Sequence, residues 1–202
     1  MSSDRDVFLS QTDVSRETIE RFDIYAALLK QWTKRINLVA PNTMPTLWRR
    51  HFLDSAQLER FMSSSVWVDL GSGGGFPGAV LAILSPETPV ALVESDQRKA
   101  AFLRTVARET GVGFRVYPER AEILEPLNAG RLSCRALASL NDLLGYAERH
   151  LAPDGRAIFM KGASAQAEID QALEHWRFDC ETYPSQTNPE AVILNIGDIK
   201  RV

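Results

Sequence analysis

The segment VWVDLGSGGGFPGAVLAI, from Val66 to Ile83, contains residue types that can bind a small ligand. An apolar, strand-like run ends in Asp69, and five glycines follow within eight residues as a predicted helix begins. A tight turn needs only one glycine to reach positive φ, so five of them indicate a loop whose backbone approaches a ligand closely. In open α/β sheets such a ligand binds beyond the carboxyl end of the strand.

Two cofactor patterns overlap in this loop. Gly73, Gly75 and Gly78 fit G-x-G-x-x-G, the spacing of dinucleotide-binding loops. In a shifted frame, Asp69, Gly71, Gly73 and Gly75 fit D-x-G-x-G-x-G. This second pattern resembles the first motif of class I methyltransferases that use S-adenosylmethionine (SAM). The glycine spacing alone is therefore compatible with either cofactor.

The charges around the loop favour SAM. A dinucleotide would place an anionic pyrophosphate near Asp69, whereas SAM carries a cationic sulfonium and an ammonium that an acid attracts. No Lys or Arg lies between Val66 and Ser95, and the GK[ST] ending of a P-loop is absent. Glu94 follows the next predicted strand and fits both cofactors, because an acid there can accept hydrogen bonds from ribose hydroxyls. We expect SAM, with an NAD-dependent oxidoreductase as the alternative.

The chain lacks the motifs with which methyltransferases activate poor nucleophiles. It has neither an N/D-P-P-Y motif, which assists exocyclic amines, nor the Pro-Cys pair that attacks pyrimidine carbons. Cys134 stands in SCRA beside Arg135, and we expect it to be a buried strand thiol rather than a nucleophile. An acceptor with a lone pair and no proton, such as guanine N7, needs only alignment with the methyl group.

Together with five further segments, the loop resembles the glucose-inhibited division protein B family, which are bacterial methyltransferases of guanine N7 in small-subunit ribosomal RNA. The segments follow the family's order and spacing from Ile36 to Gly162: INLVAP, RRHFLDS, DLGSGGGFPGAVLAI, ESDQRKAAFLR, CRALASL and FMKG. The resemblance implies the same activity here, with SAM as the cofactor and small-subunit ribosomal RNA as the partner.

The resemblance also assigns roles to individual residues. Family positions that contact SAM correspond to Gly71, Phe76, Ala121, Glu122 and Arg135. To these we add the groups that the loop chemistry indicates, which are Asp69, Gly73 and Glu94. Family positions nearer the RNA correspond to Asn37, Arg50, His51, Asp54 and Lys161. Arg135 and Lys161 are expected to position the reactants for catalysis.

Some alternatives remain open at this point. The chain departs from the family pattern at Val39, where Thr is usual, and in RLSCRA, which lacks the common Asp near its start. Arg135 could instead be a structural cation, and His51 a residue of a helix surface. A SAM-sensing ribosome-assembly factor without catalysis is a second alternative function.

Strands and helices alternate in the part of the chain that must position these residues. Strand patterns cover 66–70, 89–94, 113–117, 131–136 and 155–161, and helical patterns fit 77–84, 97–110, 140–150 and 164–175. Residues 178–202 indicate two strands around PSQTNPE, which would form a terminal antiparallel hairpin. This alternation predicts an α/β fold, the Rossmann-like class I SAM-dependent methyltransferase, with a mostly parallel seven-stranded sheet and helices on both faces.

The N-terminal part is predicted to be helical. Apolar residues recur at spacings of three and four along the segment from residue 15 to residue 36, namely Ile19, Phe22, Tyr25, Leu29, Trp32 and Ile36. The segment TLWRRHFLDSAQLERFM shows a second such pattern. We therefore expect residues 1–62 to form a helical extension and residues 63–202 the SAM-binding core, both within one structural domain.

Composition limits the partners. The chain has 202 residues, of which 45% are hydrophobic and 24% charged, which is typical of one soluble globular domain. A net charge of −3 does not suggest a protein that coats nucleic acid through bulk charge, although local basic areas remain around Arg35, Arg50 and Arg98. We therefore expect weak binding to free RNA and recognition of a folded ribosomal subunit or an assembly precursor.

The two cysteines and the terminus complete these expectations. Cys134 and Cys180 lack CxxC spacing, so neither a metal site nor a disulfide framework is expected. The N-terminus lacks the apolar core of a signal peptide, and no apolar run reaches membrane-spanning length. A cytoplasmic monomer is the expected form.

Overall fold

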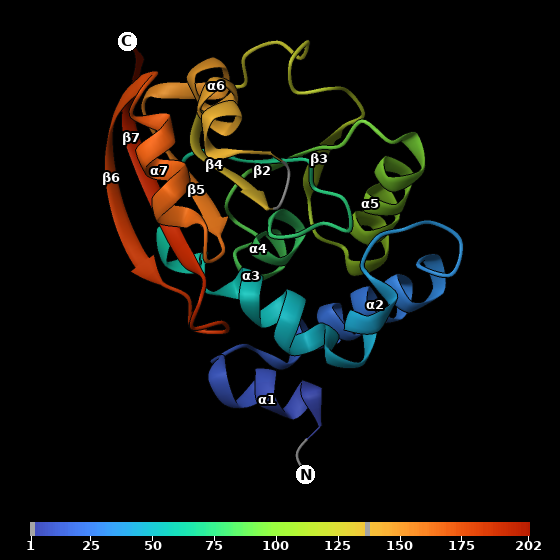
Figure 1. Cartoon of the computed structure of the whole chain (residues 1–202). Helices are drawn as coiled ribbons and strands as arrows, with labels where there is room; N and C mark the ends of the chain where they lie inside the picture. The colour runs from blue at the N-terminus through green and yellow to red at the C-terminus, as the bar shows by residue number, and fades with distance from the viewer. Residues whose placement is uncertain (1–2, 136–137) are drawn as a thin grey trace.

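A computed structural model describes residues 3–135 and 138–202. Its centre is a seven-stranded sheet in the order β3-β2-β1-β4-β5-β7-β6 (Figure 1). The strands are β1 Trp67–Leu70, β2 Val90–Val93, β3 Phe114–Tyr117, β4 Ala129–Arg135, β5 Leu151–Lys161, β6 Trp176–Pro184 and β7 Val192–Arg201. The first five are parallel, while β7 pairs antiparallel with both β5 and β6. The predicted fold class is confirmed.

The sheet positions the site because its chain order reverses at β1. The chain runs outward from β1 to β2 and β3, and then returns to place β4 on the other side of β1. The loops after β1 and β4 therefore diverge and leave a crevice at the carboxyl ends of these strands, where α/β proteins bind ligands. The end of β4 is Arg135, and the predicted residue 136 lies outside the described residues.

Helices cover both faces of the sheet, as predicted. The core of one face joins α4 (Gly78–Leu84) and α5 (Gln97–Thr110) to the N-terminal extension. The core of the other face is built on α6 (Leu140–His150) and α7 (Ala165–Ala172). Successive strand residues point to opposite faces, so β1 contributes Trp67 to the first core, and Val68 and Leu70 to the second.

The extension begins with two capped helices, α1 (Asp4–Gln11) and α2 (Arg16–Trp32). Ser15 caps α2, which buries the predicted stripe from Ile19 to Leu29. The helix ends at Trp32, so the last predicted stripe residue, Ile36, lies beyond it, and both Trp32 and Ile36 are only partly buried. The sequence pattern gave no indication of α1, although Ser3 and Asp6 form a capping box at its start.

The second helical pattern of the extension is confirmed for residues 47–56, where the π-helical η2 Trp48–Leu53 runs directly into α3 Asp54–Ala56. Short 3-10 turns flank this run, namely η1 Pro41–Thr46 and η3 Glu59–Phe61, so the predicted helix does not extend to residue 62. Pro45 lies inside η1, where it lacks the amide that a regular helix needs. Smaller differences occur elsewhere: β5 begins at Leu151 rather than 155, and α7 ends at Ala172 rather than 175.

Candidate active site

The glycine loop after β1 is held in a conformation that favours glycine. Gly71, Gly73 and Gly75 have φ values of 65°, 55° and 95°, in the left-handed region. The N-terminal extension supports the loop from behind, because the Tyr25 hydroxyl of α2 donates a hydrogen bond to the carbonyl of Gly74. A β-carbon on Gly75 would collide with the same hydroxyl. The loop shape therefore depends on α2.

Asp69, a predicted cofactor residue, lies behind the loop and lines neither of the two cavities described below. Its side chain is fully buried, and it accepts hydrogen bonds from the Ser133 hydroxyl at 2.7 Å and the Gly78 amide at 3.2 Å. Burial raises the pKa of Asp69 to about 6, although these hydrogen bonds oppose the increase. The carboxyl group therefore joins β4 and the start of α4 to the loop.

Glu94 closes the loop from the neighbouring strand. Its two carboxylate oxygens accept hydrogen bonds from the amides of Gly73 and Asp96, each at 2.8 Å. Only 7% of the residue is exposed. The Glu94 carboxylate thus fixes the glycine loop, and the same residue forms part of the wall of the crevice.

A cavity of about 340 Å³ opens over the loop, which we call the cofactor cavity. Six predicted cofactor residues line it: Gly71, Gly73, Glu94, Ala121, Glu122 and Arg135. Lys99 and Tyr146 also contribute, and the Tyr146 hydroxyl donates to the Glu122 carboxylate at 2.9 Å. The cavity has the location and the size of a small-molecule site.

A second cavity of about 470 Å³, which we call the RNA-side cavity, lies on the other side of Arg135. Its lining includes the predicted residues Arg50, His51, Asp54, Arg135 and Lys161, together with Arg49, Ser185, Thr187 and Asn188. The extension, β4, β5 and the loop between β6 and β7 all contribute residues. Asn37 is exposed and lies outside both linings.

Arg135 is in the wall of both cavities. Its guanidinium lies 4.7 Å from the ring centre of Phe76, donates to His51 Nδ1 at 3.0 Å, and approaches Asp54 Oδ2 to 3.8 Å. Phe76, a predicted cofactor residue, is 97% buried beneath it, lines neither cavity and supports Arg135 from below. Burial lowers the pKa of Arg135, and the nearby carboxylates oppose this decrease.

His51 is a buried partner of Arg135 rather than a residue of a helix surface. It stacks on Phe76 with ring centres 4.9 Å apart, and its Nε2 lies 2.8 Å from the Thr43 hydroxyl. Because Arg135 donates to Nδ1, the hydrogen-bond network assigns the proton to Nε2. Burial, together with the positive charges of Arg135 and Arg50, lowers the pKa of His51 to about 3. The ring is neutral at physiological pH.

Lys161 is engaged by the protein itself. Its ammonium donates to the carbonyl of Ala138 at 3.0 Å and to Glu168 at 2.7 Å, and Glu168 also accepts from the Leu140 amide. The lysine thus joins the end of β5 to the start of α6, beside the RNA-side cavity.

Several functional contacts had no signal in the sequence patterns. Tyr25 was indicated only as part of an apolar stripe, and its polar contact with the loop could not be read from spacing. Thr187 donates to Asp54 from 133 positions later in the chain, and Gln57 donates to the same carboxylate at 3.1 Å. Contacts this distant depend on topology. Cys134 is 99% buried in β4, as expected for a structural thiol.

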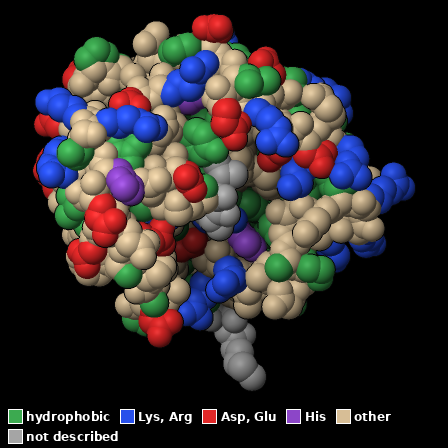
Figure 2. All heavy atoms as spheres, turned by 45° about the horizontal axis from the view of Figure 1, so that its top comes forward, with side chains coloured by type: hydrophobic (Ala, Val, Ile, Leu, Met, Phe, Trp, Pro, Cys, Tyr) green, Lys and Arg blue, Asp and Glu red, His purple; other side chains and the backbone are tan. Residues whose placement is uncertain are grey.

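Figure 2 shows Lys and Arg side chains along the right side of the molecule, where α5 lies in Figure 1, and others below the central hollow. On α5 the exposed cations are Arg98, Arg104 and Arg108. Arg98 pairs with Asp96 at 3.0 Å, and Arg108 pairs with Glu109 at 2.9 Å. Part of this face is therefore neutralised by neighbouring acids.

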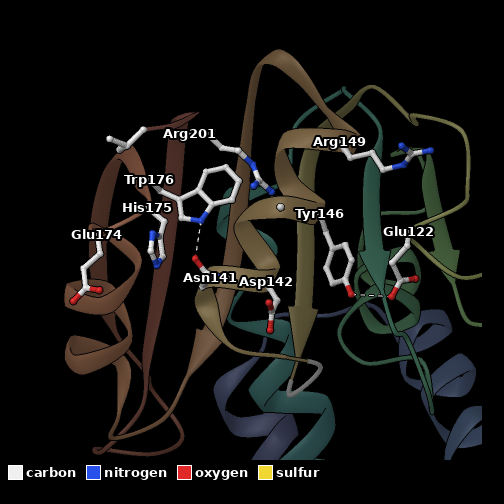
Figure 3. A pocket seen from close by; sticks show the side chains of 11 residues that line it. Glu122, Asn141, Asp142, Tyr146, Arg149, Glu174, His175, Trp176 and Arg201 are labelled. Carbon is white, nitrogen blue, oxygen red and sulfur yellow. Dashed lines mark hydrogen bonds between the residues drawn. The ribbon is translucent and has the colours of Figure 1, made fainter.

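A third cavity, of about 610 Å³, lies between α6, the start of β6 and the end of β7 (Figure 3). It adjoins the cofactor cavity, since both share Glu122 and Tyr146. Trp176 donates to Asn141 at 2.9 Å and carries the Arg201 guanidinium 4.6 Å from its ring centre. Within this lining, Trp176 pairs with Asn141 and Tyr146 with Glu122, whereas Arg149 donates to the carbonyl of Leu124 outside it.

The loop chemistry distinguishes SAM from a dinucleotide. The amide of Gly73 and the amide at the start of α4, Gly78, are donors that a pyrophosphate would use, and both already bind carboxylates. A second anion would be repelled there, whereas the cationic groups of SAM fit.

Within residues 3–135 and 138–202, no group of three or more His, Cys, Asp or Glu side chains could hold a metal ion. None of the described helices has the length and apolarity to cross a bilayer.

Known proteins of similar sequence are named as ribosomal RNA methyltransferases. Residues 18–190 match the family model described as rRNA small subunit methyltransferase G (GidB). The Ribosomal RNA small subunit methyltransferase G of Ruegeria sp. (strain TM1040) is 49% identical, covering 95% of this chain and 96% of that protein. The protein of the same name from Ruegeria pomeroyi is 50% identical, covering 94% and 96%.

Solved structures agree on the fold. A SAM dependent methyltransferase from Aquifex aeolicus superposes with a TM-score of 0.58 at 11% identity, covering 75% of this chain and 92% of that one. The M. jannaschii TYW2 in complex with AdoMet gives a TM-score of 0.56 at 13% identity, covering 75% and 76%. The fold is that of class I SAM-dependent methyltransferases, and the sequence match places this chain in the rRNA small subunit methyltransferase G family.

Proposed function

We propose that this protein transfers the methyl group of SAM to N7 of a guanine in small-subunit ribosomal RNA. The observation that carries the proposal is the position of Arg135 in the wall of both cavities. One cavity has the glycine loop and acids that suit SAM, and the other is lined by Arg49, Arg50 and Lys161. A donor and an acceptor bound in these cavities would meet at Arg135.

The cofactor roles follow the lining of the cavity. Gly71 and Gly73 allow close approach to the backbone, and Glu94 offers a carboxylate to the ribose hydroxyls. Ala121 and Glu122 border the place proposed for the adenine. Asp69 and Phe76 act indirectly, since the first fixes the loop and the second supports Arg135.

The reaction needs alignment and no general base. The N7 lone pair forms the new bond to the methyl carbon while the carbon–sulfur bond breaks and sulfur keeps its electron pair. N7 carries no proton, so none is removed in this step. Arg135 positions the reactants directly, and Lys161 does so by holding Ala138 and, through Glu168, the start of α6. The neutral His51 keeps the Arg135 fork oriented.

The RNA side combines shape with a few cations. Arg50 is exposed at the RNA-side cavity, and Asn37 is exposed outside its lining. We propose that a folded subunit or an assembly precursor is the substrate, because few cations provide only weak affinity for free RNA. The protein would act as a monomer in the cytoplasm, where ribosomal subunits are found.

Two measurements test the proposal. Calorimetry should show SAM binding at micromolar order, about −8 kcal/mol, and much weaker binding of NADH. Labelled SAM should then transfer its methyl group to small subunits that lack the modification, and not to large subunits. Tighter binding of NADH would contradict the cofactor assignment. SAM binding without transfer to any ribosomal particle would favour a non-catalytic assembly factor.

A further inference from the structure

The arrangement of charges in the RNA-side cavity contains a feature that the transfer reaction alone does not require. Among the described residues that line this cavity, Asp54 is the single carboxylate, and it stands among the cations Arg49, Arg50, Arg135 and Lys161. A site that only attracted RNA phosphates would be weakened by such an acid. The presence of Asp54 therefore favours a role in binding the RNA base rather than the phosphates.

Asp54 is fixed in one orientation. Its Oδ1 accepts hydrogen bonds from the Thr187 hydroxyl and from Gln57 Nε2 at 3.1 Å. Gln57 in turn accepts from the amide of Gln186 at 3.0 Å, which ties the β6–β7 loop to the same point. The other oxygen, Oδ2, is directed toward Arg135.

The distance between Asp54 Oδ2 and Arg135 Nη1 is 3.8 Å, too long for a direct hydrogen bond. About a fifth of each side chain is exposed. A guanidinium donor and a carboxylate acceptor therefore stand side by side at the cavity, and neither satisfies the other fully. This pair can meet a ligand edge that presents an acceptor beside a donor.

Guanine has such an edge, and its order matches the order of the cavities. Going around the base, N7 is followed by the O6 acceptor and then by the N1–H donor. Arg135 lines both cavities, whereas Asp54 lines only the RNA-side cavity. A guanine whose N7 faces the cofactor cavity would place O6 at Arg135 and N1–H at Asp54. Adenine presents the reverse, a donor at position 6 and an acceptor at N1.

We infer that Arg135 and Asp54 together select guanine as the target base, with Arg135 donating to O6 and Asp54 accepting from N1–H. This inference rests on the proposed function and adds to it the residue that excludes adenine. Asp54 is thereby a specificity-determining residue, while Thr187 and Gln57 position it. Adenine also has a nucleophilic N7, so the chemistry itself does not exclude adenine.

The test first changes the target base in the RNA and then changes Asp54 in the protein. After mass mapping locates the methylated guanosine, small subunits are reconstituted with guanosine, inosine or adenosine at that position. Inosine keeps O6 and N1–H and lacks only the 2-amino group. For the unaltered protein, kcat/KM on inosine should lie within about threefold of the value on guanosine, and adenosine should be at least about thirtyfold slower.

The variant Asp54→Asn should lower the guanosine-to-adenosine ratio of kcat/KM by at least about tenfold, because its amide can donate to adenine N1. Asp170→Asn removes a carboxylate from the exposed surface of α7 and should leave the ratio unchanged. SAM affinity measured by calorimetry checks that each variant is folded. If Asp54→Asn does not bind SAM, the comparison of inosine with adenosine in the unaltered protein decides whether O6 and N1–H of the target base are recognised.

An unchanged ratio in a SAM-binding Asp54→Asn protein would overturn the inference, and so would inosine that reacts as slowly as adenosine. Either result would leave the proposed function standing, provided that the unaltered protein produces 7-methylguanosine. Failure to form 7-methylguanosine at all would overturn both proposals.

Discussion

Arg135 shows how single residues create the site. Burying a guanidinium is costly unless other groups compensate, and here an aromatic face, an imidazole nitrogen and a carboxylate surround it. The partners come from two segments: Phe76 from the glycine loop, and His51 and Asp54 from the extension. The charge is therefore held at the boundary of the two cavities.

Removing this charge should impair methyl transfer more than cofactor binding. Arg135→Ala should lower the single-turnover rate about tenfold to a thousandfold, or about 1.4 to 4 kcal/mol of transition-state stabilisation. Cys134→Ser, at the adjacent position in β4, should stay within about threefold of the unaltered rate. A dead Cys134→Ser protein with normal SAM binding would instead indicate covalent catalysis.

His51 should make stability depend on pH in a defined direction. Its pKa is about 3 in the folded protein and near the ordinary 6.5 when unfolded, so the unfolded chain binds the proton more readily. The stability that His51 contributes is present above pH 6.5 and is lost as the pH falls toward 3. Urea unfolding between pH 7 and 4.5 should show a smaller decrease for His51→Gln than for the unaltered protein.

Parallel pH profiles for the two proteins would contradict a buried, neutral His51. Asp69 titrates near 6 in the folded state and influences both curves, which is why the comparison uses their difference.

The sequence predicted some of these residues and not their geometry. Gly71, Gly73 and Glu94 line the cofactor cavity as expected, because a glycine loop and the end of the next strand must meet at the crevice. Asp69 and Phe76 belong to the same motif, yet both are buried and neither lines the cavity. A motif gives proximity along the chain, whereas side-chain direction depends on the packing around it.

At the scale of elements, α2 and the glycine loop form one unit. The Tyr25 hydroxyl reaches a buried carbonyl, and its ring stacks on Phe76 with centres 5.8 Å apart. The helix therefore supports both the loop and the residue beneath Arg135.

Tyr25→Phe should weaken this connection without changing the shape of the side chain. The carbonyl of Gly74 would lose its partner, which should lower the free energy of unfolding by about 1–3 kcal/mol and also reduce SAM affinity. Tyr183→Phe is the matched control, since that hydroxyl donates to the exposed Glu181 and its loss should cost less than about 0.5 kcal/mol. Equal effects of the two substitutions in urea unfolding and calorimetry would refute a special role for Tyr25.

The elements after Val66 could be predicted because strand-like runs alternate with helical patterns, and α4, α5, α6 and α7 follow β1, β2, β4 and β5. In the extension the prediction was incomplete. The helical backbone of residues 47–56 was indicated by the apolar spacing, but the change from π to α geometry and the end of the run at Ala56 were not. Phe52 of this run packs against Phe8 and Phe76. The aromatic contacts among these rings are set by tertiary structure, which a local periodicity does not contain.

At the scale of the whole molecule, the extension and the sheet share one core. Residues of α1, α2, η2, α4 and α5 belong to a single apolar cluster that also includes strand residues such as Trp67 and Leu92. We propose that residues 1–62 and 63–202 fold as one unit, so that the RNA-side cavity exists only when both are present.

The overall charge of −3 predicts a modest dependence of RNA binding on salt. About three neutralised phosphates would give a slope near −2 to −3 when log affinity for small subunits is plotted against log salt concentration. Arg49→Ala should reduce the magnitude of the slope by about one, whereas Arg177→Ala, outside the RNA-side cavity, should leave it unchanged. A slope near about −10 would require a much larger basic surface than this molecule has.

Mass spectrometry of the methylated product tests the central claim most directly. Small subunits that lack the modification are incubated with the protein and labelled SAM, and the RNA is then digested to nucleosides and to mapped fragments. The account predicts that the label appears as 7-methylguanosine, at one position of the small-subunit RNA. Label on another atom, on another base or at many positions would contradict it.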